Sequence, residues 1–412
     1  MKCTRVLYVR IKTVNWHTLP LIIRLDIFMR YIPLFLGMAF AFACGSSTDQ
    51  STDSLATTNK VITIQEDKDT QIQVVKIDSL HQQTVVEETR PYKKTILTTE
   101  STKQVSEKVD YLSLPHSTPT TYKNASNLVI ENVQFTNPSG NNLVLINCTN
   151  IIIRNCYFGA SKEEAISIEK GSKITIEKNL FANNKSCVYS YNTTGGIVIR
   201  NNQFINIKGP HPRAQYVQLN SCTGGGNVIE NNKGECWPGE SNPEDLISIF
   251  KSRGTSDSPI LIRNNIFRGG GPSESGGGIM TGDNGGGNVI VENNILVDPG
   301  QYGIAASGGN NIIIRNNKIF ARPQKFTNVG IYAWAQADAD CKDIEIANNN
   351  INYTSGKNGE AEKNNLFIEK NCGAVRGVES NRFTLTLEEL QLPSRLIDFI
   401  SAEELRLIRG KK

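Results

Sequence analysis

The phrase Asn127-Leu-Val-Ile-Glu-Asn-Val-Gln-Phe135 recurs through much of this 412-residue chain. Its next copies are Asn150-Ile-Ile-Ile-Arg-Asn-Cys-Tyr-Phe158 and Lys173-Ile-Thr-Ile-Glu-Lys-Asn-Leu-Phe181. The central isoleucine, or a valine in its place, returns at steps of 22 to 33 residues, at Ile130, Ile153, Ile176, Ile199, Ile229, Ile262, Val291, Ile314, Ile346 and Ile368. A short base period, lengthened by insertions, is typical of a solenoid in which each repeat forms one coil.

Each copy has the pattern of a β-strand, because Val, Ile, Thr and Phe alternate with other residues over four or five positions. A second run of this kind lies midway between copies, for example Leu143-Val-Leu-Ile146 and Ala165-Ile-Ser-Ile168. Two strands per coil predict an all-β fold, a right-handed single-stranded parallel β-helix of about ten coils over residues 122–383.

Asparagine stands three residues after the central position in eight copies, at Asn179, Asn202, Asn232, Asn265, Asn294, Asn317, Asn349 and Asn371. Because Asn tolerates the left-handed conformation, we expect these residues at the turn that ends the strand, with their amides stacked in a ladder. We expect an internal aromatic stack of Phe135, Phe158, Phe181, Phe204 and Phe267. Both sets are interpreted as structural.

Residues 1–43 have the pattern of an export signal. The apolar segment 31–43 follows Arg30, is too short to span a bilayer, and leads to Ala41-Phe-Ala-Cys44. This ending resembles a bacterial lipobox, which implies a lipidated Cys44 and a protein anchored in the cell envelope, at the outer membrane or cell surface. A start at Met29 would leave residues 1–28 untranslated. The alternative is an ordinary cleaved signal on a secreted or periplasmic protein.

Three segments flank the repeats. Residues 44–60 are small and polar, as expected of a flexible linker. Residues 61–121 fit a spacer, a small β segment or an N-terminal cap, and the sequence does not distinguish these. Residues 384–412 contain two capping-box patterns, starting at Thr386 and Ser401, which predict two short helices that cover the last coil.

Charge and cysteine content limit the classes of partner and cofactor. From Cys44 onward the chain has 38 basic and 39 acidic residues, so charge gives no support for a nucleic-acid partner. The seven cysteines after the leader include no C-x-x-C pair, which argues against a zinc site. Cys222 and Cys236, on either side of a Gly-rich segment, are the first candidates for a disulfide. A capped solenoid predicts a monomer.

Strand alternation predicts which side chains of the second run point outward. If Val188, Val217, Ile247, Ile279, Ile304 and Ile331 point inward, their neighbours form one exposed face, which includes Tyr189, Tyr191, Gln218, Asn220, Phe250, Tyr332 and Trp334. Aromatic rings and amides along a rod suit stacking on sugars and hydrogen bonding to hydroxyls. We therefore predict that this face binds a polysaccharide or surface glycan.

Over residues 122–383 the chain resembles the pectate-lyase-like, right-handed parallel β-helix proteins of bacterial envelopes. That superfamily includes polysaccharide lyases, pectin hydrolases, uronan epimerases and non-catalytic adhesive rods. A lyase or epimerase needs a cation beside the uronate carboxylate, a base for the C5 proton and a donor for the leaving oxygen.

The insertions between copies supply candidates for these roles. Lys251 is the favoured base and His211 the alternative, while Arg253 or Arg213 would bind the carboxylate. Glu244, Asp245 and Asp283 are candidate Ca²⁺ ligands. Two hypotheses stay open: an enzyme that acts on a uronic-acid polysaccharide, and a glycan-binding rod that does no chemistry. They differ in whether these side chains converge on one point.

Overall fold

The computed structural model describes residues 74–77, 84–87, 109–210, 212–336 and 339–411. The chain divides into two compact units, Met1–Glu100 and Ser101–Lys412. In the first unit, strands β1 (Val74–Ile77) and β2 (Thr84–Glu87) form an antiparallel pair. The predicted signal, the lipidation site Cys44 and the linker lie outside the described residues.

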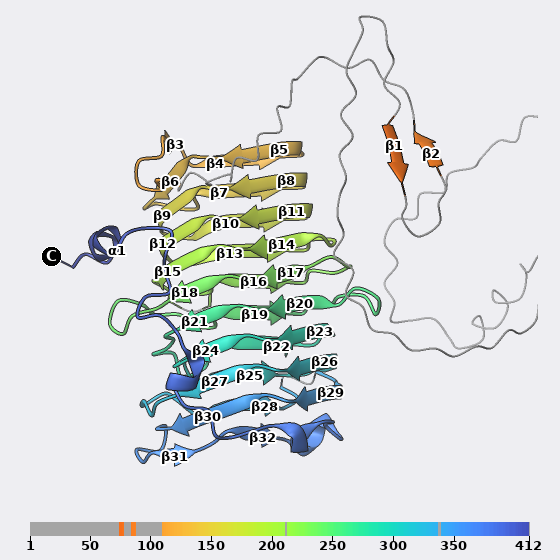
Figure 1. Cartoon of the computed structure of the whole chain (residues 1–412), viewed down its shortest axis with the longest axis vertical. Coiled ribbons are helices and arrows are strands. Elements are labelled where there is room, and N and C mark those ends of the chain that lie inside the picture. Colours follow the sequence, from red (N-terminus) through yellow and green to blue (C-terminus); the bar gives the residue numbers. More distant parts are fainter. Residues whose placement is uncertain (1–73, 78–83, 88–108, 211, 337–338, 412) are drawn as a thin grey trace, which may run out of the picture. The chain divides into compact units, whose positions relative to one another are not determined.

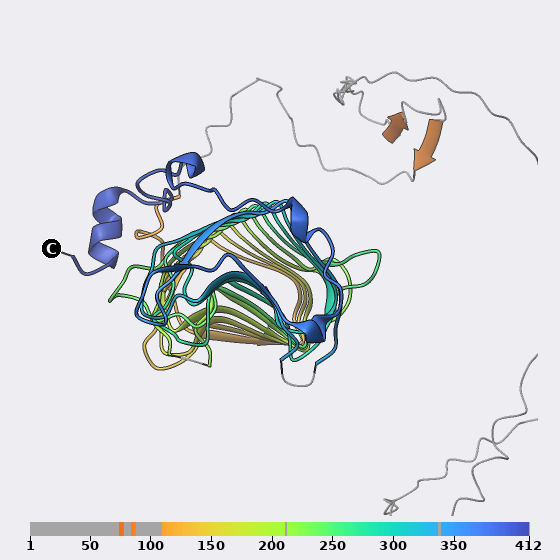
Figure 2. The same ribbon diagram turned by 90° about the horizontal axis from the view of Figure 1, so that it is seen from below.

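The second unit is a right-handed parallel β-helix, in which three sheets run along the stack of coils (Figures 1 and 2). The first sheet contains β4 (Thr120–Lys123), β7 (Leu143–Ile146), β10 (Glu164–Glu169), β13 (Ser186–Tyr191), β16 (Val217–Asn220), β19 (Ile247–Phe250), β22 (Ile279–Asp283), β25 (Tyr302–Ala306), β28 (Val329–Ala333) and β32 (Leu366–Ile368). The second contains β5 (Ser126–Glu131), β8 (Thr149–Arg154), β11 (Ser172–Glu177), β14 (Ile197–Arg200), β17 (Val228–Glu230), β20 (Ile260–Arg263), β23 (Gly287–Glu292), β26 (Gly309–Arg315) and β29 (Cys341–Ala347). The third contains β3 (His116–Ser117), β6 (Gln134–Asn137), β9 (Tyr157–Ser161), β12 (Leu180–Asn184), β15 (Gln203–Ile207), β18 (Lys233–Glu235), β21 (Ile266–Arg268), β24 (Ile295–Val297), β27 (Lys318–Ala321), β30 (Asn350–Ser355) and β31 (Glu362–Lys363).

Each coil therefore has three strands, and the prediction of two was wrong. The repeated phrase is not one strand but two strands with a corner between them. In the first copy, β5 ends at Glu131 and β6 begins at Gln134, and Asn132 between them has a φ of 55°. A corner of two residues hardly interrupts the apolar pattern, so the sequence reads as continuous.

The sequence pattern also predicts the wrong sheet for the tenth copy of the phrase. Its strand β32 pairs with β28 in the first sheet, whereas the other nine central residues lie in the second sheet. The same alternation of apolar residues suits either sheet, because both bury one face.

The asparagine ladder is confirmed, with two corrections. In each step one amide oxygen accepts both from the backbone N–H and from the amide nitrogen of the preceding Asn, as Asn265 does for Asn232 at 3.0 and 2.9 Å. The left-handed residue is the one before the ladder position, such as Asn264 with a φ of 56°. The ladder ends at Asn381 rather than Asn371, which instead bonds to the backbone of Ala335.

The aromatic stack is also confirmed inside the coils. Phe135, Phe158, Phe181 and Phe204 follow one another with ring centroids 4.9–5.3 Å apart. The next coil has Gly234 at this position, and the Tyr216 ring fills the space between Phe204 and Phe267. A Cβ on Gly234 would lie 2.6 Å from that ring, so glycine is required there.

The outer face of the second sheet is covered by ion pairs between successive coils. Glu131–Arg154, Glu177–Arg200, Glu230–Arg263 and Glu292–Arg315 approach to 2.6–2.8 Å. The pairs arise because the strand-end residue alternates in charge from one coil to the next. Such partly exposed pairs stabilise a fold only weakly, but they give this face its polar character.

The C-terminal segment runs back along the third sheet (Figure 1). It does not cover the last coil, so the predicted position of this segment is wrong. Leu385 and Leu390 pack on Val297, near the short 3₁₀ turn η3 (Glu388–Leu390). Further on, Ile397, Ile400 and Leu405 pack on Leu180, Ala182 and Ile205. One of the two predicted helices forms as an α-helix, α1 (Ala402–Ile408), with the expected capping box between Ser401 and Glu404. The tail is drawn to the third sheet because its strands carry apolar residues at outward positions.

The predicted disulfide between Cys222 and Cys236 is wrong. Both thiols are free and buried; that of Cys222 donates to the Ser190 carbonyl, and that of Cys236 contacts the Tyr216 hydroxyl. Cys341 and Cys372 are bonded instead. Within the described ranges, no helix has the length and apolar character needed to cross a membrane.

Candidate functional site

The predicted outward face exists on the first sheet. Its central row runs in register through Tyr189, Gln218, Ser248, Met280, Ala305 and Tyr332. A neighbouring row contains Tyr191, Asn220 and Phe250, as alternation requires. Three long insertions, 208–216, 236–246 and 269–278, lie where third-sheet strands lead into this sheet. The sequence thus located both the face and the insertions beside it.

Three rings on this face are open to solvent. Tyr191, Trp334 and Phe367 are 37, 45 and 43% exposed, whereas Tyr189, Met280 and Tyr332 are largely buried by their neighbours. Phe367 lies in register with Tyr332 and was missed, because its strand had been assigned to the repeated phrase. The amide oxygen of Gln218 is buried and has no hydrogen-bond partner among the described residues.

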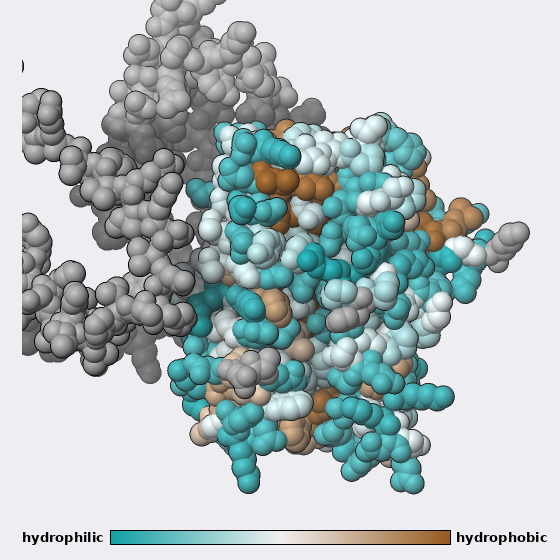
Figure 3. All heavy atoms as spheres, turned by 180° about the vertical axis from the view of Figure 1, so that it is seen from behind, coloured by the Kyte–Doolittle hydropathy of each residue, from teal (hydrophilic) through white to brown (hydrophobic). Residues whose placement is uncertain are grey.

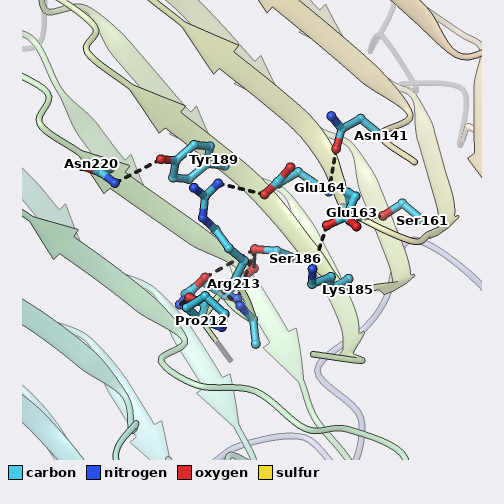
Figure 4. A network of polar contacts seen from close by, with 12 residues as sticks. Asn141, Ser161, Glu163, Glu164, Lys185, Ser186, Tyr189, Pro212, Arg213 and Asn220 are labelled. Carbon is cyan, nitrogen blue, oxygen red and sulfur yellow. Dashed lines mark hydrogen bonds and ion pairs between the residues drawn. The ribbon is translucent and has the colours of Figure 1, made fainter. Parts of the chain in front are cut away.

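Arg213 lies against this face and is held in a polar network (Figure 4). Its guanidinium stacks 3.6 Å from the centre of the Tyr189 ring, and its Nη1 lies 3.0 Å from a carboxylate oxygen of Glu164. Asn220 donates to the Tyr189 hydroxyl at 3.0 Å from the other side. Arg213, Tyr189 and Asn220 are therefore brought together, but the charge of Arg213 is already paired.

The other predicted cations do not join this network. Arg253 donates to the amide oxygen of Asn310 at 2.8 Å and to the Gly286 carbonyl at 2.9 Å, which holds it at the corner leading to the second sheet. The ammonium of Lys251 lies 5.2 Å from the Phe250 ring centre. Burial raises the pKa of Asp283, and the charge of Lys251 opposes that rise. The alternative base, His211, lies outside the described residues.

The predicted Ca²⁺ ligands Glu244 and Asp245 are engaged in hydrogen bonds within the protein. The Glu244 carboxylate accepts hydrogen bonds from Ser273 and Ser275, at 2.6 and 2.5 Å. One oxygen of the buried Asp245 carboxyl accepts from the Tyr302 hydroxyl and from the Gly277 N–H. Nowhere in the described residues are three His, Cys, Asp or Glu side chains grouped to hold a metal ion. We therefore assign no chemistry to a metal here.

Asp245 makes the stability of this region depend on pH. Burial raises the pKa of Asp245 to about 7, against the hydrogen bonds from Tyr302 and Gly277, which lower it. The folded protein thus keeps a proton that the unfolded chain loses above about pH 4, and this contribution to stability is lost as pH rises through about 7.

We expect Asp245→Asn to remove this loss of stability, because an amide oxygen can accept the same two hydrogen bonds without ionising. The wild-type protein should lose a few kcal/mol, at about 1.4 kcal/mol per pKa unit, between about pH 4 and about pH 8, and the variant should not. Thermal unfolding of both proteins across this range checks the prediction. Parallel pH profiles would contradict it.

A hollow of about 440 Å³ lies among the insertions. Its walls include Lys208, Glu240, Asn242, Pro272 and Phe326. Glu240 is engaged by Arg409 and Lys411 of the C-terminal segment, and the hydrogen bond from Arg409 is the largest cause that lowers the pKa of Glu240 to about 2. The predicted site residues take no part in lining this hollow, and it is separate from the exposed rings of the first sheet.

The three sheets present different outer surfaces. The second carries the ion pairs, and much of the third is covered by the C-terminal segment. The surface seen in Figure 3 is mostly hydrophilic, with separate hydrophobic patches. The first sheet is the one of the three that combines exposed aromatic rings with few charges.

Comparison with known proteins supports the fold. Residues 116–254, about a third of the chain, match the family model described as "Right handed beta helix region". Among curated proteins, none matches this chain in sequence.

Solved structures similar to the chain have different activities. They include an exopolygalacturonase of Thermotoga maritima (12% identity, 58% of this chain and 80% of that chain, TM-score 0.38). Another is the catalytic domain of an α-1,3-glucanase in complex with nigerose (13% identity, 63% of this chain and 50% of that chain, TM-score 0.44). A third is the surface adhesin PfbA of Streptococcus pneumoniae (13% identity, 59% of this chain and 66% of that chain, TM-score 0.38). At this level of similarity, no activity of these proteins extends to this chain.

Proposed function

We propose that this protein binds a polysaccharide along the outer face of the first sheet. The observation that carries the proposal is the contrast among the three faces: the first has exposed Tyr191, Trp334 and Phe367 on strands with few charges or directly after one. Trp334 and Phe367 belong to the paired strands β28 and β32 or follow directly on them, and neighbouring exposed rings on an otherwise polar protein mark an interaction surface. An extended chain of sugars suits such a face, because its rings offer apolar surfaces for stacking and its hydroxyls suit amides such as Asn220.

Binding without cleavage is favoured over the lyase or epimerase that the sequence also suggested. Of the predicted cations, Arg213 is paired with Glu164, and Arg253 is turned to Asn310 and Gly286. Glu244 and Asp245 are occupied by hydrogen bonds within the protein. A base and a carboxylate-binding cation that share one point are what the elimination needs, and the described side chains support no such set.

The test is a binding panel combined with an assay for products. Immobilised pectin, alginate, glucans, mannan and glycosaminoglycans are incubated with the protein, and bound protein is measured together with the ultraviolet absorbance of unsaturated uronates. We expect retention on at least one polysaccharide and no rise in absorbance. Release of unsaturated or shortened products would replace the binding proposal with an enzymatic one, and retention on none would overturn it.

The proposed site of action is the bacterial envelope, through a lipid on Cys44. Support comes from the leader sequence alone, since Cys44 lies outside the described residues. Cys44→Ser should abolish incorporation of labelled palmitate and move the protein from the membrane fraction to the soluble fraction, because the thiol is the acceptor of the lipid. A protein that keeps its label and fractionation would contradict the anchor.

A further inference from the structure

Lysine and arginine are missing from most of the proposed binding face. Nine described strands of the first sheet, from β7 (Leu143–Ile146) to β32 (Leu366–Ile368), contain neither residue. The acidic residues on these strands are Glu164, Glu169 and Asp283. By contrast, each of the second-sheet strands β8 (Thr149–Arg154), β14 (Ile197–Arg200), β20 (Ile260–Arg263) and β26 (Gly309–Arg315) ends in arginine.

The cations on and beside the face have acidic neighbours. Arg213 lies 3.0 Å from Glu164, and Lys170 lies 3.0 Å from Glu169. The backbone N–H of Lys251 donates to the Asp283 carbonyl at 2.8 Å. Burial raises the pKa of the Asp283 carboxyl, and the nearby charge of Lys251 opposes that rise. These cations therefore add little net positive charge to the face, and a ligand carboxylate would have to compete with carboxylates of the protein.

A uronic-acid polymer carries one negative charge on each acidic sugar. Laid along these strands, it would bring a row of carboxylates to a surface with acidic residues and with no cation on the nine strands. A neutral polysaccharide needs no unpaired cation, and it can use the aromatic and amide groups that the face does offer.

We infer that the polysaccharide bound by this face is uncharged. This inference rests on the proposed function, and it narrows the substrate class from glycans in general to neutral ones. Polar recognition then depends on short-range hydrogen bonds and ring stacking, so affinity should be nearly independent of ionic strength.

The experiment compares two classes of soluble polysaccharide with the folded protein. Neutral glucan, mannan and arabinan form one class, and polygalacturonate and alginate form the other. Affinities are measured by isothermal titration at about 50 mM and about 500 mM salt, a range over which screening reduces exposed charge interactions strongly. We expect binding to a neutral polymer that changes less than about twofold with salt, and no binding to the uronans at either concentration.

Charge variants provide a matched control. Glu177→Gln and Glu230→Gln, combined, remove two carboxylates from the second sheet, outside the face, and affinity for the neutral polymer should stay unchanged. Salt-sensitive binding to a uronan, without binding to any neutral polymer, would overturn the inference and leave the proposed function standing. Absence of binding to both classes by a protein with a cooperative unfolding transition would overturn both.

Discussion

Trp334→Ala should weaken polysaccharide binding by about tenfold or more, because a single exposed indole on a binding face commonly contributes more than about 1.4 kcal/mol. Trp334 is 45% exposed and follows directly on β28, in line with the outward side of the sheet. Its removal takes away stacking surface without leaving a cavity in the core. Titration of the variant with the polysaccharide retained in the binding panel measures the loss.

Two further variants make this test specific. Phe383→Ala removes a ring of similar exposure, 46%, which follows Arg382 beside the third sheet, and it should leave affinity unchanged. Tyr191→Ala removes a ring five strands away from Trp334 in the first sheet, about 24 Å at about 4.8 Å per strand. A long polymer should lose affinity in both face variants, whereas an oligosaccharide shorter than this span should respond to only one. Equal losses in Trp334→Ala and Phe383→Ala would contradict the assignment of the face.

Asn265→Ala is expected to cost on the order of 4 kcal/mol of stability, because it leaves several buried groups without partners at about 1–3 kcal/mol each. The Asn265 side chain accepts from the backbone N–H and the amide of Asn232, and it donates to the Ile229 carbonyl and to Asn294. A loss of this size is a large share of the stability of an ordinary domain. The shift in the urea midpoint, with the slope of the transition, measures it.

Asn371→Ala is the matched control for the ladder. Sequence spacing places Asn371 in the ladder, but in the structure this residue is exposed and its amide bonds to the backbone of Ala335. This substitution should cost about 1 kcal/mol or less, because water can replace its hydrogen bonds. Comparable destabilisation by the two variants would show that a buried ladder residue contributes no more to the free energy of unfolding than an exposed asparagine.

The position of the proposed binding face was largely predictable, and the contacts of its charged residues were not. Strand alternation places Tyr189, Gln218 and Tyr332 on one side of the sheet whatever the partner strand is. Whether Arg213 is free to bind a carboxylate depends on Glu164, which lies 49 positions earlier in the chain. Arg253 likewise meets Asn310, which is 57 positions away. No spacing rule connects residues so far apart.

The sequence by itself determined the solenoid, its asparagine ladder and its phenylalanine stack, because each arises from a residue type that returns once per coil and meets its own copy in the next coil. The tertiary structure alone decided that each coil has three strands, that the C-terminal segment lies on the third sheet, and that Cys341 bonds to Cys372. These features depend on the direction in which the chain turns at each corner and on contacts between non-repeating segments. A periodic pattern carries no information about either.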